Sequence, residues 1–249
     1  MSIKRHVASF VERAFNVRFV RPHVVTRLFE EFHLKKVLHR FDVDCVFDIG
    51  ANTGQYAEML REKAGYRGEI LSYEPNPNVV ATLRERAKGD LNWHINEVAL
   101  GCAAGRRPFN IMANDQFSSF LSPSETDTKL CTQLNRIERR IDVETHTLAQ
   151  EFANWSQQIR FRHPFLKMDT QGNDVAVIQG GESVLRNFIG IQTELAIKRL
   201  YDGAPEFVDA LEYIRSMGFE LSALVPNNEG HFPQLIEIDA ILIRKDLMV

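Results

Sequence analysis

Residues 45–55 read C-V-F-D-I-G-A-N-T-G-Q, an apolar stretch that reaches Asp48 and then enters a turn containing Gly50, Asn52 and Gly54. This pattern predicts a buried strand, a turn and a helix that starts near Gln55. Glycines let the backbone approach a ligand closely, and the first turn of a helix presents unpaired N–H groups. We therefore expect residues 49–55, called the glycine turn below, to bind a nucleotide-like ligand.

Short apolar strands alternate with helices along most of the chain. Strands are expected at 69–73, 93–95, 165–168 and 190–193, and helices at 55–63, 78–88 and 205–217. This alternation predicts an α/β fold with a doubly wound, mostly parallel sheet. The last two strands, 219–224 and 235–244, are expected to pair antiparallel across a polar loop at 226–234. A strand near 108–112 precedes a break in the rhythm, and the sheet is expected to resume at 141–144.

The composition describes an ordinary globular protein with an uneven charge distribution. The net charge is −3, with 44% hydrophobic and 25% charged residues. Three cysteines, none of them in a C-x-x-C pair, argue against a disulfide framework or a zinc site. The chain shows no apolar signal segment and no run long enough to span a membrane, so a cytoplasmic location is expected. Because the charge outside residues 1–40 is negative, no nucleic-acid partner is expected.

The first forty residues differ from the rest in charge, because nine Lys/Arg and three acids give them a net charge of +6. Apolar residues recur at helical spacing in two segments, first from Ile3 to Phe15 and then from Val24 to Phe32. We expect residues 1–40 to form an N-terminal helical extension and 41–249 to form the main domain. The extension is expected to cover one edge of the core; the alternatives are contact with a membrane surface or with another subunit.

Acidic residues end several of the predicted parallel strands. They are Asp48, Glu74, Asp169 and Glu194, and ligands in open parallel sheets bind beyond such strand ends. Glu74 stands one strand–helix–strand unit after the glycine turn, where a carboxylate can accept hydrogen bonds from a ribose diol. Capping of the next helix is the alternative for Glu74. Asp48 is expected to position the glycine turn or to meet the ligand directly, and residues 97–100, including Val98 and Ala99, are expected to hold an adenine edge.

A polar run from Asn114 to Arg140 interrupts the alternation. Irregular segments of this length are most often functional covers or mobile loops. The run is therefore a candidate lid over the substrate, with a plain surface insertion as the alternative.

Five segments, taken together and in order, resemble the FkbM family of S-adenosylmethionine-dependent methyltransferases. They are V-F-D-I-G-A-N-T-G-Q-Y, S-Y-E-P-N-P, N-E-V-A-L-G, F-L-K-M-D-T-Q-G-N-D and E-I-D-A-I-L-I, spread from about Asp44 to Arg244. The resemblance implies a class I, Rossmann-like methyltransferase domain over 41–249. It also implies that S-adenosyl-L-methionine is held by the glycine turn, Glu74 and residues 96–99. The implied acceptor is a hydroxyl of a sugar, a glycan, a glycolipid or a secondary metabolite.

The resemblance also suggests how the methyl transfer is assisted. Asp169 is the first candidate for the base that takes the hydroxyl proton, Glu194 is the second, and Lys167 can stabilise the developing alkoxide. One alternative is that Asp169 and Glu194 share a divalent cation. Another is that Lys167 only forms a salt bridge to Asp169 or Asp174.

Two residues depart from the family pattern K-I-D-x-E-G-x-E. This chain has Gln171 in place of the first glutamate and Asp174 in place of the second. Loss of a carboxylate at 171 raises the alternative of a non-catalytic protein that only binds the cofactor. A nicotinamide-dependent oxidoreductase is less consistent with the sequence, because Asn52 occupies the middle position of the turn where dinucleotide folds carry glycine.

Overall fold

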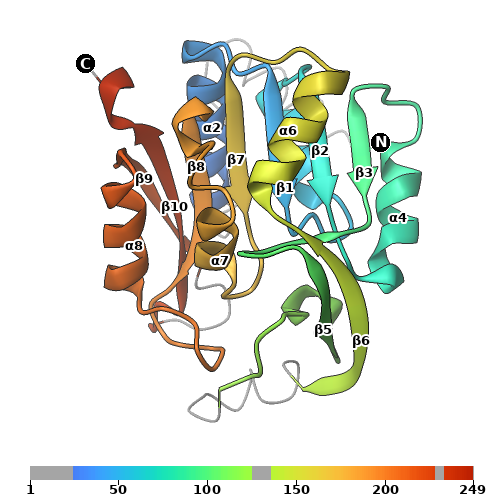
Figure 1. Cartoon of the computed structure of the whole chain (residues 1–249). Helices are drawn as coiled ribbons and strands as arrows, with labels where there is room; N and C mark the ends of the chain where they lie inside the picture. The colour runs from blue at the N-terminus through green and yellow to red at the C-terminus, as the bar shows by residue number, and fades with distance from the viewer. Residues whose placement is uncertain (1–24, 125–135, 228–232, 249) are drawn as a thin grey trace, which may run out of the picture.

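A computed structural model describes residues 25–124, 136–227 and 233–248 of the 249-residue chain. Its centre is a seven-stranded sheet with the order β3-β2-β1-β7-β8-β10-β9 (Figure 1). The strands are β1 (Cys45–Ile49), β2 (Glu69–Tyr73), β3 (Trp93–Asn96), β7 (Pro164–Met168), β8 (Gly190–Ala196), β9 (Phe219–Asn227) and β10 (Glu237–Arg244). Only β10 is antiparallel to its neighbours β8 and β9. The predicted doubly wound, mostly parallel α/β sheet with a final antiparallel strand is confirmed.

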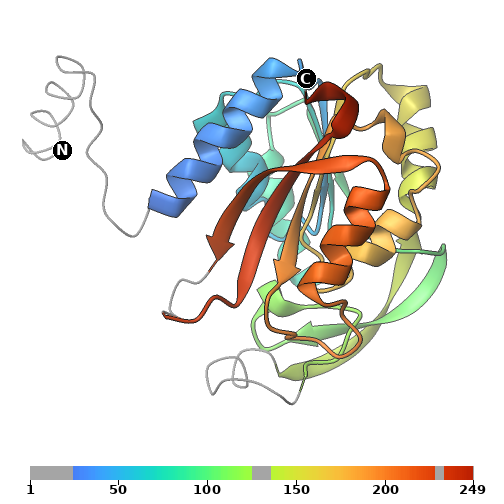
Figure 2. The ribbon, with the colours of Figure 1, turned by 90° about the vertical axis from the view of Figure 1, so that its left-hand side faces the viewer.

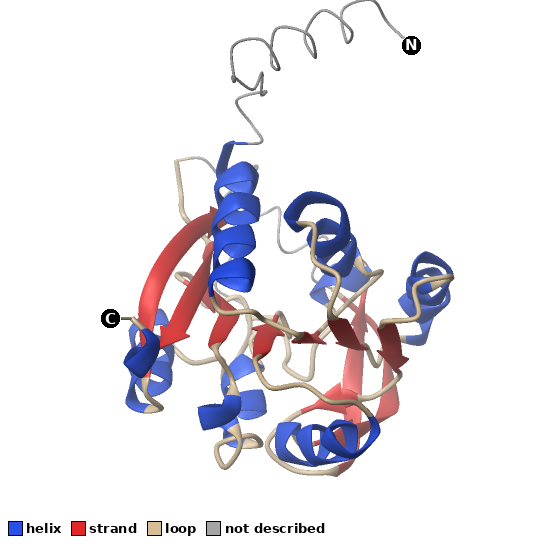
Figure 3. Ribbon diagram, turned by 90° about the horizontal axis from the view of Figure 1, so that it is seen from above, coloured by secondary structure: helices blue, strands red, loops and turns tan. Residues whose placement is uncertain are grey.

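Helices cover both faces of this sheet, as the view from above, down the length of the strands, shows (Figure 3). One face carries α2 (Val25–Arg40), α3 (Gln55–Met59), the π-helical turn η2 (Leu60–Ala64) and α4 (Pro77–Ala87). The other carries α6 (Leu148–Gln158), α7 (Asp174–Gln179) and α8 (Phe207–Ser216). Side chains of a strand alternate between the two faces, so β1 sends Val46 into one hydrophobic cluster and Phe47 into the other. Burial on both sides explains why these strands are apolar throughout.

The strand predicted at 141–144 does not rejoin the central sheet, so that expectation is wrong. β4 (Ala99–Leu100), β5 (Gly105–Met112) and β6 (Ile137–His146) form a separate three-stranded sheet in the order β4-β6-β5. It lies beyond the carboxyl ends of the parallel strands (Figure 1). Exposed residues interrupt the buried ones along β6, whereas every residue of β1 and β7 is buried. A strand with one solvent-exposed face suits this small mixed sheet, in which β6 pairs parallel to β4 and antiparallel to β5, and not the middle of the buried parallel sheet.

Helix α2 packs on the sheet beside η2 and β9 through residues other than those expected (Figure 2). Its buried residues are Leu34, Val37 and Leu38, whereas Val25 and Phe29 are 52% and 51% exposed. The C-terminal half of α2 lies on the core and the N-terminal half extends past it. Periodicity identifies an apolar face but not where along the helix that face meets a partner. The helix expected at Ile3–Phe15 lies outside the described residues, and the division at residue 40 stays a prediction.

Other boundaries shift by a few residues for local reasons. The helix after the glycine turn ends as the π-helical turn η2 at Gly65, whose φ is 72°. Helix α4 begins at Pro77 because the Asn76 side chain accepts a hydrogen bond from the Asn78 N–H. None of the helices in the described ranges is long and apolar enough to cross a membrane.

We predict that Leu34→Ala lowers the free energy of unfolding by about 2–4 kcal/mol, because it leaves a cavity where α2 meets the core. Phe29→Ala, on the exposed half of the same helix, should cost less than about 1 kcal/mol. Urea denaturation of both variants measures the difference. Equal, small costs would mean that α2 is an appendage and not part of the packed domain.

Candidate functional site

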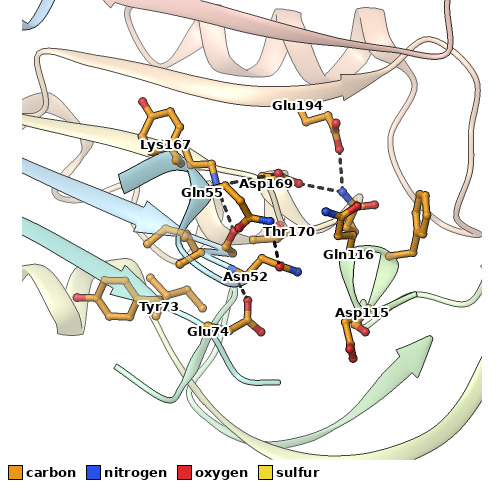
Figure 4. Close-up of a pocket in the computed structure, with 18 of the residues that line it drawn as sticks. Asn52, Gln55, Tyr73, Glu74, Asp115, Gln116, Lys167, Asp169, Thr170 and Glu194 are labelled. Carbon is orange, nitrogen blue, oxygen red and sulfur yellow. Dashed lines mark hydrogen bonds and ion pairs between the residues drawn. The ribbon is translucent and has the colours of Figure 1, made fainter. Parts of the chain in front are cut away.

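A cleft of about 620 Å³ opens at the carboxyl edge of the central sheet (Figure 4). The turns after β1, β2 and β7, strand β8, the start of β10 and the N-terminal part of α2 all contribute to its walls. Most of the residues expected from the sequence line it: Gly50, Asn52, Gln55, Glu74, Val98, Ala99, Lys167, Asp169 and Glu194. Asp48 and Gly54 do not, and their surroundings give each another role.

Gly50 brings the glycine turn directly against the turn after β7. Its φ is 75°, and a Cβ at this position would lie 1.9 Å from the carbonyl oxygen of Asp169. Any side chain would therefore push the two turns apart. Asn52 also has a left-handed backbone, with φ 49°, and its Oδ1 accepts a hydrogen bond from the Thr53 N–H at 2.7 Å. The close contact between the two turns fixes Asp169 beside the glycine turn.

Gly54 serves packing and not a wall of the cleft. It precedes α3 with φ 92°, and a Cβ there would meet the ring of Trp93 at 2.8 Å and Leu83 at 2.9 Å. The missing side chain lets the start of α3 lie against α4 and β3. The expectation that Gly54 contacts the ligand therefore finds no support in the lining of the cleft.

Glu74 is held by the backbone at the end of β2. Its two carboxylate oxygens accept hydrogen bonds from the N–H groups of Asn52 and Asn76, each at 2.8 Å. Burial raises the pKa of Glu74 to about 7, against the lowering effect of those two bonds. Asn76 caps α4, so capping is not the task of Glu74. Each oxygen retains a lone pair, and the side chain lies in the wall of the cleft.

An apolar wall stands beside Glu74. Val98, Ala99 and Leu100 come from the end of β3 and from β4, and Phe109 and Phe120 come from the small sheet and the segment that follows β5. The candidate lid contributes to the cleft only in part. Asp115–Ser118 and Phe120 line the cleft, residues 137–140 belong to β6, and residues 125–135 lie outside the described residues. We call the cleft from Gly50 to this wall the glycine-turn half.

Asp48 and Lys167 form a buried ion pair beneath the cleft. The Lys167 Nζ lies 3.1 Å from Asp48 Oδ1 and donates to the Gly50 carbonyl oxygen, also at 3.1 Å. Burial would lower the pKa of Lys167, but the carboxylates of Asp48 and Asp169 outweigh it and raise that pKa above its ordinary value. Lys167 therefore stays charged. Its main partner is Asp48, whereas Asp169 Oδ2 is 4.0 Å away, so the expected bridge to Asp169 or Asp174 is secondary.

Gln171 links the two remaining acidic candidates. Its Nε2 donates to Asp169 Oδ1 at 2.9 Å and to Glu194 Oε2 at 3.0 Å. Burial and the carboxylates of Glu237, Asp169 and Asp239 raise the pKa of Glu194 well above its ordinary value. The Asp169 side chain is 41% exposed and faces the cleft. Glu194 lies inside β8 and not after its end.

Asp174, the second departure from the family pattern, is structural. Its carboxylate accepts hydrogen bonds from the Thr170 N–H at 2.8 Å, from the Thr170 hydroxyl and from the Thr193 hydroxyl at 2.6 Å. It is buried and does not line the cleft. The shorter side chain ties the turn after β7 to β8.

Sequence reasoning missed three acids in the cleft. Glu237 and Asp239 start β10, and Glu30 on α2 accepts a hydrogen bond from Gln192 Nε2 at 2.7 Å. An antiparallel strand brings its beginning, not its end, to the carboxyl edge, and Asp239 lies opposite Glu194 in the register. The period-2 spacing of E-I-D could have found them. We call the set Asp169, Glu194, Glu237, Asp239 and Glu30 the acidic half of the cleft.

The arrangement of side chains in the acidic half bears on the alternative of a bound cation. Within the described ranges, no group of three or more His, Cys, Asp or Glu side chains is arranged to hold a metal ion. Burial, followed by neighbouring carboxylates, raises the pKa of both Glu237 and Asp239. Protons can therefore relieve part of the repulsion in this half.

The chain is similar to several known proteins. The family profile described as Methyltransferase FkbM domain matches residues 48–221. The 2-O-methyltransferase NoeI of Sinorhizobium fredii is 28% identical over 206 residues, which cover 79% of this chain and 78% of that protein.

Two solved structures are also similar, with TM-scores below 0.5. A methyltransferase FkbM from Methylobacillus flagellatus has a TM-score of 0.47 and 12% identity, with coverage of 80% of this chain but only 44% of that one. Aeropyrum pernix fibrillarin with S-adenosyl-L-methionine has 0.43 and 11%, with coverage of 79% and 66%.

We predict a pH-dependent stability difference between the wild type and Glu74→Gln. The folded-state pKa of about 7 lies above the ordinary value of 4.5, so the stability associated with protonated Glu74 is lost as pH rises through 7. A glutamine has no proton to lose, although it forfeits one backbone hydrogen bond at every pH. Urea denaturation should show the variant gaining about 2–3 kcal/mol relative to the wild type between pH 5 and pH 8.

Glu85→Gln, on the exposed face of α4, is the control for that measurement. It removes the same charge and should track the wild type across the range. A Glu74→Gln variant that also tracks the wild type would show that Glu74 titrates normally.

Proposed function

This chain belongs to the FkbM methyltransferase family, and from that premise we propose that it transfers a methyl group from S-adenosylmethionine to a hydroxyl oxygen of a sugar or glycan. The observation that carries the proposal is the position of Asp169. Its backbone touches the glycine turn at Gly50, and its carboxylate faces the acidic half of the cleft. One carboxylate thus stands where a donor in one half and an acceptor in the other would meet.

The glycine-turn half fits the donor by shape and chemistry. The carboxylate of Glu74, with a free lone pair on each oxygen, suits the two hydroxyls of a ribose. The wall formed by Val98, Ala99 and Leu100 suits a planar adenine ring. Gly50, Asn52 and Gln55 remain for the amino-acid end, and Asp48 supports the turn from below through Lys167.

Each charged side chain has a distinct task in the proposed reaction. S-adenosylmethionine supplies a methyl group that is already activated for transfer. Asp169 accepts the hydroxyl proton, and a base in this position typically adds about 10²- to 10⁴-fold to the rate. Glu194 is a weaker candidate because it lies inside β8 and because burial and neighbouring carboxylates raise its pKa well above the ordinary value, which disfavours its ionised form. Lys167 stays charged and lowers the energy of negative charge that develops on the acceptor oxygen.

The acidic half indicates the chemistry of the acceptor. Carboxylates, whether ionised or protonated, bind hydroxyl groups well, whereas an anionic acceptor would meet like charges in this half of the cleft. A neutral, polyhydroxylated acceptor therefore fits best. NoeI, the curated relative, is described as a 2-O-methyltransferase, which favours a hydroxyl over a nitrogen or carbon acceptor. Gln171 keeps Asp169 in place, so nothing at this position favours a non-catalytic role.

We predict that the protein binds S-adenosylmethionine and its demethylated product, and that Glu74→Ala weakens both about 10- to 100-fold through lost hydrogen bonds to the ribose. Isothermal titration calorimetry measures the affinities. Glu69→Ala, at the opposite end of β2 and paired with His94, should bind like the wild type. Absence of binding heat with either ligand in the wild type would refute the proposed donor.

We predict that Asp169→Asn reduces methyl transfer about 10²- to 10⁴-fold with little change in cofactor affinity. The assay uses S-adenosylmethionine labelled in the methyl group and a panel of neutral sugars and oligosaccharides, with phosphorylated and carboxylated sugars alongside. Transfer should favour the neutral acceptors. An unchanged rate in the variant would remove Asp169 from the role of base.

A further inference from the structure

The turn after β7 holds a glutamine in an uncommon backbone conformation. Gln171 has φ 53° and is followed by Gly172 with φ 87°. A left-handed backbone at a residue other than glycine costs energy and persists only where the surroundings impose it. The Gln171 carbonyl oxygen accepts a hydrogen bond from the Ser119 hydroxyl at 2.7 Å, so the segment after β5 pins the turn.

The orientation of the Gln171 amide is also fixed. Its Oε1 lies 2.8 Å from the Tyr201 hydroxyl, which is also 3.0 Å from the Phe117 carbonyl oxygen. The single Tyr201 proton is shared between these two acceptors. With Oε1 facing a donor, Nε2 must face the carboxylates of Asp169 and Glu194. The reverse orientation would set an amide oxygen against two acids, which is unfavourable.

The Gln171 side-chain amide therefore donates its two N–H groups to the carboxylates of Asp169 and Glu194. Two facing carboxylates normally need a proton or a cation between them. Lys167 lies 4.0 Å from the other oxygen of Asp169, but it is engaged with Asp48 and the Gly50 carbonyl oxygen. A glutamate at 171 would place a third carboxyl group against Asp169 and Glu194 and, when ionised, would have no hydrogen-bond donor for them.

We propose that Gln171 is a positioning residue that joins Asp169 and Glu194 through one neutral amide and thereby keeps Asp169 oriented to act as the base. The inference rests on the proposed function and adds a residue to it. Asp169 Oδ1 is bound to the amide, which leaves Oδ2 for the acceptor hydroxyl. Gln171, which stands where the family pattern has a glutamate, thus holds the two acids in place with an amide.

Two nearly isosteric variants test the proposal. Gln171→Glu adds a carboxylate, and Gln171→Met keeps the bulk but has no donors. Gln157→Glu, on the exposed surface of α6, controls for the added charge. Stability is measured first, because it requires neither cofactor nor acceptor. The melting temperature of Gln171→Glu should fall by roughly 5 °C relative to the wild type at pH 8.5 and by clearly less at pH 5.5.

The sign follows from the third acid. In the folded protein its pKa should exceed its unfolded value, so stability is lost as pH rises through the folded pKa. Gln157→Glu should show the same small shift at both pH values. Equal losses at pH 5.5 and 8.5 in Gln171→Glu would overturn the proposal, because a carboxyl group held against Asp169 and Glu194 must become more unfavourable as it ionises.

Kinetics supply the second readout, with an acceptor that the wild type methylates. Both variants should lose about 10-fold or more in kcat with less than about a 2-fold change in KM for S-adenosylmethionine. The acid limb of the kcat/KM profile should move upward by about one pH unit in Gln171→Glu. Unchanged pH profiles would contradict a positioning role.

The same assay with EDTA and then with added Mg²⁺ tests the rival arrangement. Wild-type turnover that requires Mg²⁺ would overturn the proposal, since a cation would then do what the amide is inferred to do. If the wild type transfers no methyl group to any acceptor, the proposed function fails. The stability measurements still decide whether the amide bridges the two acids.

Discussion

The ion pair between Lys167 and Asp48 underlies every part of the site. Asp48 is fully buried and Lys167 nearly so, and they join neighbouring strands β1 and β7 directly beneath the cleft. Leaving either charge alone in this position would cost about 3–5 kcal/mol. Lys167 also donates a hydrogen bond to the Gly50 carbonyl oxygen. One ammonium group therefore ties the glycine turn to the end of β7 and places a positive charge beneath the cleft.

The side chains that surround the Lys167 ammonium group in the cleft are mostly acidic. Glu74 on one side and Asp169, Glu194, Glu237 and Asp239 on the other give a site dominated by carboxylates. Backbone N–H groups donate hydrogen bonds to Glu74, and the Gln171 amide donates to Asp169 and Glu194. The raised pKa values of Glu237 and Asp239 favour their neutral forms, which reduces the remaining repulsion between carboxylates. Such a site suits a positively charged methyl donor and a neutral acceptor rich in hydroxyl groups.

The sequence alone predicts the features that depend on local pattern. Continuous apolar strands, the glycine turn that contains Gly50 and the acids that end β2 and β7 can all be read from residue type and spacing. Features that depend on the pairing of distant segments cannot. Strand β6 was assigned to the wrong sheet because its partner is β5, and the acids of β10 were missed because an antiparallel strand reverses which end reaches the cleft. The packing of Gly54 against Trp93 could not be read from the sequence either, because this contact spans 39 positions.

A crystal structure of the protein with S-adenosylhomocysteine would test the division of the cleft most directly. The account predicts the ribose hydroxyls on the Glu74 carboxylate, the adenine against Val98 and Ala99, and the sulfur beside the turn that contains Asp169. The acidic half, from Glu194 to Asp239, should remain open for an acceptor. A ribose bound to Glu237 or Asp239, with Glu74 free of the ligand, would contradict the account.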